Sequence, residues 1–495
     1  MKISETSRQI TVMLCALETD VLPELKSTSA LTSAGLIKSN LEELLKRETT
    51  TPSILSGANR EGAAIVEAMR ALLAGETGMA SLETPTPGAG FSFHQVRNEY
   101  EALLNEITQL AQKLSAARTP ASDKAISALL HRAAEWECGV HARLREPVTS
   151  APINAGINHD PLPGAALESF IQSVHPDGKA ATITAFERIH GGFAKQTFKF
   201  TLRDASGNDS ELIARKMDRI PVFSLKAFLI EREFHLLQAL HAAGFPVAKP
   251  LWVTASPPPG VDANFCIMEK LSGSPPGSFL GGASQLPEPL LLDLAALLAR
   301  LHSIGLDQFS DYIEKFEAPQ LHTDTVESCY RRTVADWKRY TKEVDHLPSP
   351  VVAYLFDWLE RNTPHDTRPP VLIHSDYGIH NVLARDGRVT AVLDWEAAMF
   401  GAPEQDLAWI KPHIARHIDW DRFLAHYVAS GGREPDTKSF DYYAAFSAMF
   451  SLAGVTRSVC NYQSGAVPDI RITMIEHGFA SHLMQYAMTS IGNKP

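Results

Sequence analysis

The chain has 495 residues, of which 44% are hydrophobic and 21% are charged, and its formal net charge at pH 7 is -11. This length exceeds one ordinary hydrophobic core and predicts two or three domains. The acidic balance argues against a nucleic-acid partner, because broad nucleic-acid binding requires a basic face.

Five cysteines are spread along the chain without C-x-x-C spacing, which favours reduced thiols over disulfides or a zinc site. The N-terminal segment MKISETSRQITVMLCALETD is interrupted by charged residues and lacks the pattern of a signal peptide. No apolar run reaches the ~20 residues that a membrane helix requires. We therefore expect a cytoplasmic protein without a membrane partner.

Residues 1–145 are predicted to form an all-α helical domain. Apolar residues recur at helical spacing in two stripes, namely Ile10, Leu14, Leu17, Val21 and Leu25, and then Val96, Tyr100, Leu103, Ile107, Leu110 and Leu114. Another helix is expected to begin at Ser122. The stripes favour a packed helical core that docks on the rest of the chain, and they also make these helices candidates for a homodimer interface.

The composition changes at residues 146–167, a stretch rich in Pro, Gly and Asn that we interpret as a linker. Runs rich in β-branched and aromatic residues follow, and they predict strands at 181–189, 196–202, 210–217 and 264–273, with a helix at 224–244. From about residue 285 the pattern is mostly helical. We therefore predict an α+β arrangement of two lobes, residues 168–270 and 271–495.

The segment HSDYGIHNVLARDGRVTAVLDWE, residues 374–396, concentrates polar side chains in an apolar part of the chain. It predicts a β-hairpin with a two-residue D-G turn. In this register Asn381 faces Val392, and Asp394 lies diagonally from Asn381 on the same face. An amide and a carboxylate at such positions can both reach one hard cation, and oxygen ligands of this type suit Mg²⁺.

Asp376 precedes this hairpin, and the pattern Asp376-x4-Asn381 followed by Asp394 resembles the catalytic loop and metal-binding aspartate of the protein-kinase-like fold. The surrounding sequence, including GAPEQDLA, is similar to the aminoglycoside phosphotransferase and choline kinase family. This resemblance implies a bilobal protein-kinase-like fold after the helical domain, with ATP and Mg²⁺ as cofactors. It further implies that Asp376 is the catalytic base and that Asn381 and Asp394 are catalytic metal ligands. Asp406, within GAPEQDLA, is expected to hydrogen-bond the catalytic loop.

The same resemblance implies a nucleotide site in the first lobe. Its residues would be Gly191, Gly192, Lys195, Arg215 or Lys216, Glu233, Glu269 and Leu271. The glycines and Lys195 would lie over the phosphates, and a cation of the third strand would be held by Glu233. Arg215 is favoured as that cation, but the pattern does not separate it from Lys216. The backbone of Glu269 and Leu271 would bind adenine.

The chain departs from the family pattern at three positions. Ser375 replaces the usual Gly, His380 directly precedes Asn381, and Ala194 stands where many relatives have Ser. Ala194 and Ser375 leave open a catalytically weak kinase-like module that binds nucleotide and acts through its N-terminal helices.

The expected reaction transfers the ATP γ-phosphoryl group to a hydroxyl of a small molecule. In this family the acceptor pocket is built mainly by helices of the second lobe. Residues 441–495 contain only Asp441, Asp469 and Glu476 as acids and are rich in aromatic and small residues. We therefore expect a less polar or anionic alcohol, for example a hydroxyacyl thioester. An aminoglycoside- or macrolide-modifying kinase is the alternative.

A different chemistry would be a non-haem iron site formed by His374 and Asp376 with His413 or His417. Such a triad normally lies on a β-barrel, whereas the residues after Asp394 have a helical pattern. It would also leave Asn381, Asp394 and the glycine loop unexplained, so we disfavour it.

Overall fold

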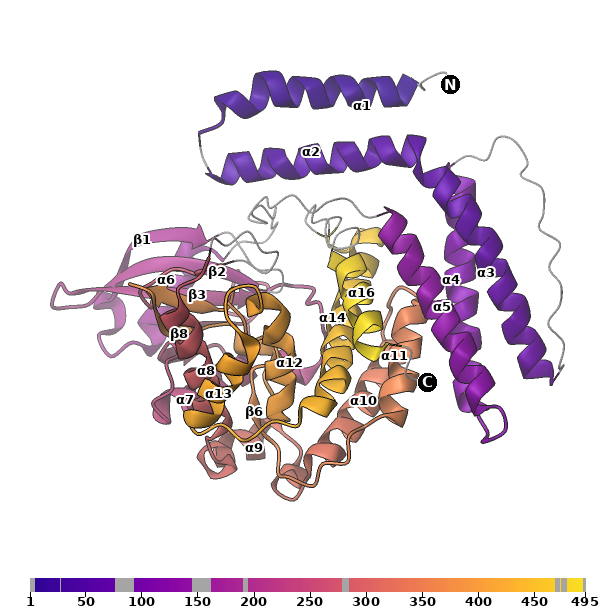
Figure 1. Ribbon diagram of the computed structural model, residues 1–495. Helices are drawn as coiled ribbons and strands as arrows, with labels where there is room; N and C mark the ends of the chain where they lie inside the picture. Colours follow the sequence, from indigo (N-terminus) through magenta and orange to yellow (C-terminus); the bar gives the residue numbers. More distant parts are fainter. Residues whose placement is uncertain are drawn as a thin grey trace. The chain divides into compact units, whose positions relative to one another are not determined.

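The computed structural model describes residues 5–26, 28–75, 93–144, 162–189, 195–277, 285–467, 472 and 479–492. The chain divides into two compact units, each made of segments that are distant in sequence. Unit 1 comprises Met1–Ala155, Val334–Thr363 and Ala448–Pro495, and unit 2 comprises Gly156–Thr333 and Pro364–Ser447. Figure 1 shows their helices and strands, with labels where there is room. The domain boundaries predicted from the sequence stay predictions.

The described part of unit 1 is helical, which confirms the predicted helical N-terminal region. Its helices are α1 (Glu5–Ala16), α2 (Thr28–Thr49), α3 (Thr51–Ala74), α4 (Phe93–Ala116), α5 (Asp123–Leu144), α11 (Pro350–Arg361) and α16 (Ala480–Ile491), with the C-terminal portions of α10 (Val326–Glu343) and α14 (Phe440–Gln463). Helices α1 and α2 lie side by side (Figure 1). The second predicted stripe lies on α4, where Val96, Ile107 and Leu114 are buried.

Close packing of α3, α4 and α5 explains a glycine in α3. The ring of Trp136 lies over Gly62, so that a Cβ at this position would come within 2.7 Å of the ring. Trp136 Nε1 donates to the Ala58 carbonyl at 2.9 Å, and Asn59 Nδ2 donates to the Val96 carbonyl at 2.9 Å. The three helices therefore form one bundle with hydrogen bonds between side chains and neighbouring backbones.

Helices α4 and α5 also pack on α11, which lies more than 200 residues later in the chain. Glu137 is buried in α5 and accepts hydrogen bonds from Ser349 Oγ at 2.9 Å and Val351 N at 2.7 Å. Arg118 Nη2 pairs with Asp357 Oδ2 at 2.7 Å. Glu137 thus satisfies a backbone N–H that the first turn of α11 leaves without an intrahelical partner.

Burial raises the pKa of the Glu137 carboxyl from 4.5 to about 7, although hydrogen bonds from Val351 and Ser349 lower it. The folded chain therefore binds a proton more tightly than the unfolded chain between these pH values. We expect the contribution of this carboxyl to stability to be fully present below about pH 4.5. It should fall by about 3 kcal/mol as the pH rises through 7.

The Glu137→Gln variant should lose this pH dependence, and Glu135→Gln on the exposed side of α5 serves as the control. Thermal unfolding between pH 4.5 and 8 measures both. If Glu137→Gln keeps the wild-type slope, another group is responsible for it.

Within its described residues, unit 2 contains a five-stranded antiparallel sheet with the order β1-β2-β3-β5-β4. The strands are β1 (Thr182–Ile189), β2 (Lys195–Arg203), β3 (Asp209–Met217), β4 (Pro250–Val253) and β5 (Phe265–Glu269). Phe198 and Phe200 of β2 share a hydrophobic core with Leu167 and Ile171 of α6 (Gly164–Val174). Helix α7 (Ile230–Ala242) packs against β4 and β5. The predicted strands are confirmed. The predicted helix is present as α7, but it begins at Ile230, six residues after the predicted start at 224, and Lys226–Phe228 form a separate 3-10 turn.

The rest of unit 2 is mostly helical. It contains α8 (Glu288–His302), α9 (Ser310–Phe316), the N-terminal portions of α10 and α14, α12 (Pro403–Ile414) and α13 (Trp420–Ala429). Two short antiparallel pairs accompany them, β6 (Val371–Ile373) with β9 (Met399–Gly401) and β7 (Val382–Arg385) with β8 (Arg388–Val392). No described helix is by itself long and apolar enough to cross a membrane, although the bent pair Glu288–His302 and Leu306–Phe316 meets that test by length and composition.

The β7–β8 hairpin has the predicted turn. Asp386 and Gly387 both adopt positive φ, +54° and +73°. Arg385 faces Arg388 across the turn. Positive φ at both central residues matches the twist of the flanking strands, and Asp-Gly accepts it readily.

The predicted register further along the hairpin is wrong by one residue. Val382 faces Val392, whereas the sequence placed Asn381 opposite Val392. Thr390 is the extra residue of a β-bulge, and its hydroxyl donates to the Ser272 carbonyl at 2.9 Å. The bulge moves Asn381 one residue beyond the paired strands, directly before β7.

Candidate active site

The loop after β6 has a left-handed backbone that one buried carboxylate holds in place. Ser375 has a φ of +66°, which favours glycine. Asp406 in the first turn of α12 accepts hydrogen bonds from His374 N at 2.8 Å and Ser375 N at 2.7 Å. His302 Nε2 lies 3.1 Å from the same carboxylate, and its Nδ1 lies 2.9 Å from Tyr427 Oη. Asp406 therefore has the role that the sequence predicts.

Three side chains contact the carboxylate of Asp376. Trp409 Nε1 donates to Oδ1 at 3.0 Å, Asn381 Nδ2 donates to Oδ2 at 2.7 Å, and His380 Nε2 lies 3.3 Å from Oδ1. Burial raises the pKa of Asp376, but the hydrogen bond with His380 and the charge of His380 hold it below its ordinary value. Asp376 is therefore an ionised and oriented carboxylate, and 34% of its side chain is exposed.

Sequence reasoning missed Trp409, which orients Asp376. Trp409 lies three residues after Asp406 in α12, a spacing that places both side chains on one side of the helix. That spacing is the signal that could have identified it. His302 and Tyr427 were missed because their partners lie more than 100 residues away in the chain.

Asn381 directly precedes the β7–β8 hairpin, and Asp394 lies two residues after its end. Asn381 Nδ2 also donates to the Asp376 carbonyl at 2.9 Å, so the amide oxygen is kept as an acceptor. Asp394 has a left-handed φ of +61°, and its Oδ1 accepts from Arg215 Nη2 at 2.8 Å. Burial raises the pKa of Asp394, whereas the charges of Arg215 and Lys195 lower it, to about 2.

These two oxygen donors fit a divalent cation that arrives with a phosphate ligand. Among the described residues, no three His, Cys, Asp or Glu side chains gather to hold a metal ion by themselves. Mg²⁺ usually keeps several waters and is bound by one or two carboxylates together with substrate phosphates. The carboxylate of Asp394 and the amide oxygen of Asn381 therefore suit a Mg²⁺ ion that is also bound by phosphate, and not a metal ion that protein ligands hold alone.

Two cations and two further carboxylates adjoin Asp394. Glu233 of α7 pairs with Arg215 (Nη1 to Oε1, 2.5 Å) and with Lys195 (Nζ to Oε2, 3.0 Å). Lys195 also pairs with Glu396. Burial lowers the pKa of Lys195, but Glu233 and Glu396 raise it, to about 12 overall. The predicted residues Lys195, Arg215 and Glu233 are thus brought together with Asp394.

Lys216 does not join this cluster. Successive side chains of a strand point to opposite faces of a sheet, and Lys216 shares the α6 face with Leu212 and Ala214. It is fully buried there, and its Nζ lies 2.5 Å from Asp262 Oδ1. Of the two adjacent cations, Arg215 is the one that points to the candidate active site.

The other predicted nucleotide-binding residues are only partly described. Gly191 and Gly192 lie outside the described residues. Glu269 is the last residue of β5, and Leu271 lies in the connector that follows. Ser274 in this connector forms an isolated β-bridge with the hairpin. Adenine binding by the backbone of Glu269 and Leu271 stays a prediction.

The alternative iron site is not supported by the geometry. His374 Nε2 lies 2.8 Å from the Leu393 carbonyl, and its Nδ1 accepts from Asp376 N at 3.3 Å. Both ring nitrogens are therefore engaged by the backbone. His417 contacts Leu286 N through its Nδ1 at 3.4 Å.

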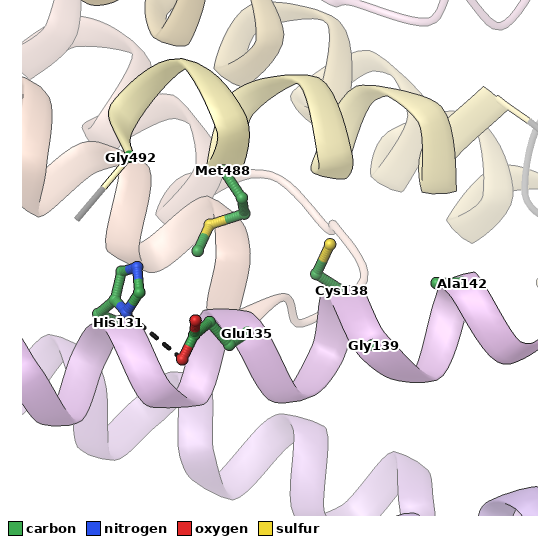
Figure 2. A pocket seen from close by; sticks show the side chains of 7 residues that line it. All are labelled: His131, Glu135, Cys138, Gly139, Ala142, Met488 and Gly492. Carbon is green, nitrogen blue, oxygen red and sulfur yellow. Dashed lines mark ion pairs between the residues drawn. The ribbon is translucent and has the colours of Figure 1, made fainter.

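Unit 1 has a cavity of its own, shown in Figure 2. It has a volume of about 340 Å³ and is lined by His131, Glu135, Cys138, Gly139, Ala142, Met488 and Gly492. Burial, with the charges of Glu137 and Glu135, raises the pKa of the Cys138 thiol, which disfavours the nucleophilic thiolate. The predicted active-site residues do not line it, so we place the candidate active site in unit 2.

A family profile described as "Phosphotransferase enzyme family" matches residues 185–443, just over half of the chain. The chain belongs to this family. The match covers most of the five-stranded sheet, the Asp376 loop and α12. The predicted protein-kinase-like fold after a helical region is therefore confirmed for this phosphotransferase.

The chain is 30% identical over 261 residues to acyl-CoA dehydrogenase family member 11 of Rattus norvegicus, and the match covers 47% of this chain and 32% of that protein. It thus spans about a third of the length of this curated relative. It is 51% identical over 37 residues to the hygromycin-B 4-O-kinase of Escherichia coli, covering 8% of this chain and 11% of that enzyme. Macrolide 2'-phosphotransferase MphH of Brachybacterium faecium has a similar solved structure, with 18% identity, a TM-score of 0.41, and coverage of 66% and 98%.

The left-handed backbone of Ser375 generates a stability prediction for this phosphotransferase. A non-glycine residue costs about 1–2 kcal/mol in this conformation, and glycine costs about 0.5–1 kcal/mol in chain entropy. We expect Ser375→Gly to raise the free energy of unfolding by about 0.5–1 kcal/mol, measured by denaturant unfolding. Ser375→Ala keeps the Cβ and removes the hydroxyl, so it should change stability little. An equal gain in Ser375→Ala would assign the effect to the hydroxyl.

Proposed function

We propose that this protein moves the γ-phosphoryl group of ATP to a hydroxyl group of a small molecule. The observation that carries the proposal is the placement of Asp376. Its carboxylate is ionised, oriented by Trp409 and Asn381, and partly exposed. A carboxylate so arranged can orient an incoming hydroxyl and accept its proton.

In the proposed reaction the acceptor oxygen forms a bond to the γ-phosphorus while the bond from that phosphorus to the ADP oxygen breaks. The hydroxyl proton passes to Asp376. Asn381 and Asp394 would hold Mg²⁺, which would neutralise negative charge on the phosphates when bound. Lys195 and Arg215 add positive charge from the sheet. Most of the catalysis would then come from position and electrostatics.

The complete set of Asp376, Asn381 and Asp394 favours an active enzyme over a catalytically weak nucleotide-binding module. Ser375 keeps the left-handed backbone that glycine favours, and its N–H donates to Asp406 at 2.7 Å. A cytoplasmic location and a homodimer through the N-terminal helices stay predictions.

Asp376→Asn should keep nucleotide binding and lose turnover, because the amide cannot accept the hydroxyl proton. We expect ATP affinity within about threefold of wild type and a loss in kcat of at least about 100-fold. Calorimetry and ADP release measure the two quantities. Asp386→Asn in the exposed hairpin turn is the matched control, since Asn also tolerates positive φ. Retention of more than a tenth of the turnover in Asp376→Asn would refute the assignment of the base.

The acceptor is proposed to be a less polar or anionic alcohol, such as a hydroxyacyl thioester. One support for this acceptor class is the small number of acids in residues 441–495. A second is the set of side chains around Asp376. The described side chains that contact the Asp376 carboxylate are those of Trp409, Asn381 and His380, none of which is a carboxylate, and the ring of His413 lies against the rings of His380 and Trp409. The acyl-CoA dehydrogenase name of the relatives also suits a thioester acceptor. The short match to hygromycin-B 4-O-kinase favours an aminoglycoside as the second candidate.

A panel of acceptors separates these candidates. We expect ADP release with hydroxyacyl-CoA esters or simple and aromatic alcohols, and at least about tenfold lower kcat/KM with aminoglycosides and macrolides, because few carboxylates are available for polycations. Asp376→Asn serves as the blank for each compound. Efficient turnover of kanamycin-type compounds would overturn the acceptor class and leave the phosphotransfer reaction in place.

A further inference from the structure

We propose that the cavity of unit 1 is a binding site for a small aromatic amine. The two helices that form it, α5 and α16, both belong to unit 1 and lie outside residues 185–443, which match the family profile. The proposed site is therefore separate from the candidate active site and does not depend on the proposed phosphotransfer reaction.

One side of α5 forms a wall of the cavity. The lining residues of this helix recur at i, i+4, i+7, i+8 and i+11, a spacing that places them on one side of a helix, and they are His131, Glu135, Cys138, Gly139 and Ala142. Met488 projects from α16 towards this side (Figure 2). The cavity therefore lies between two helices that pack on each other.

Gly139 keeps part of this space open. A Cβ at this position would meet no atom within 4 Å, so packing against a neighbour does not require glycine there. At Gly62 of α3, by contrast, the ring of Trp136 occupies the place of a Cβ. Glycine inside a helix is less stable than alanine, because it loses more conformational freedom on folding. The open space at Gly139 thus destabilises α5, and a ligand that fills it would offset this effect.

The size and the apolar part of the lining favour an aromatic ring. The volume of about 340 Å³ is at the lower end of the range for ligand sites. It exceeds the roughly 150 Å³ of an engineered cavity that binds benzene. Cys138 and Met488 contribute sulfur atoms to the lining, and Ala142 contributes a methyl group. Because sulfur makes favourable contacts with aromatic rings, a single ring with a short side chain suits this space.

The charge of the lining favours an amine. Glu135 is the one carboxylate among the described lining residues, and these include neither lysine nor arginine. Its Oε2 lies 3.5 Å from His131 Nδ1, and 60% of its side chain is exposed. The ring of His131 is also packed edge-on against Tyr354 of α11, with 5.4 Å between the ring centroids. A ligand ammonium can therefore approach Glu135 more closely than His131 does.

Calorimetric titration of the full chain with 2-phenylethylamine, 2-phenylethanol and 3-phenylpropanoate tests the ligand class. We expect one-to-one binding of the amine with a Kd of about 1 mM or below. The alcohol should bind about two- to fivefold more weakly, since a largely exposed ion pair adds little, and the anion more weakly still. Glu135→Gln should remove the preference for the amine and leave the affinity for the alcohol within about twofold.

Gly139→Leu tests the location. The leucine should fill the cavity, lower the affinity for the amine at least about tenfold, and raise the midpoint of thermal unfolding, so that unfolding does not account for the loss. Gly57→Leu is the matched control, because Gly57 lies inside α3, has no atom within 4 Å of its Cβ position and does not line the cavity. It should bind the amine as wild type does.

Three results would overturn the proposal. These are a wild-type chain that binds none of the three compounds, tightest binding of the anion, and a Gly139→Leu variant that binds the amine as tightly as wild type. Should Gly139→Leu unfold at a lower temperature than wild type, Glu135→Gln decides, because its exposed substitution leaves the helix packing intact. An unchanged preference for the amine in Glu135→Gln then rejects the site.

Discussion

The candidate active site depends on the hydrogen bonds that the buried carboxylate of Asp406 accepts. This carboxylate accepts two backbone N–H groups from the loop that begins at His374, and it is supported in turn by His302 and Tyr427. A left-handed residue such as Ser375 persists where surrounding contacts fix it. The same helix supplies Trp409, which orients the carboxylate of Asp376. Helix α12 therefore fixes the backbone of the loop through Asp406 and orients the Asp376 carboxylate through Trp409.

A second constraint is the burial of several charges in a small volume. Isolated charges are strongly disfavoured inside a protein, but paired and hydrogen-bonded ones are tolerated. Here Glu233 is shared between Lys195 and Arg215, and Arg215 is shared between Glu233 and Asp394. Sharing leaves each charge with an opposite partner, but it also means that a change at one residue alters the environment of the others. The side chains from the sheet, α7 and the segment after β8 act as one electrostatic group.

Local sequence pattern was sufficient to predict the strands, the presence of the α7 helix and the hairpin turn. It also identified the spacing of Asp376, Asn381 and Asp394. Strand alternation would also have separated Arg215 from Lys216, since Lys216 shares the parity of the apolar residues Leu212 and Ala214. The bulge at Thr390 was not predicted from the hairpin sequence. The Thr390 hydroxyl donates to the Leu383 carbonyl within the hairpin and to the Ser272 carbonyl, which lies 118 residues earlier. The contacts of α5 with α11 are equally non-local. The roles of the individual site residues and the domain boundaries stay predictions.

The discontinuous make-up of unit 1 has a consequence for how the chain folds during synthesis. Helix α5 is complete long before the ribosome reaches α11, since Glu137 and Ser349 are 212 residues apart. At about 5–20 residues per second this interval is roughly 10–40 s. During that time Glu137 lacks the N–H and hydroxyl donors of α11, and the faces of α4 and α5 that α11 covers are open to other chains. We therefore expect unit 1 to be most prone to association with other chains during this interval.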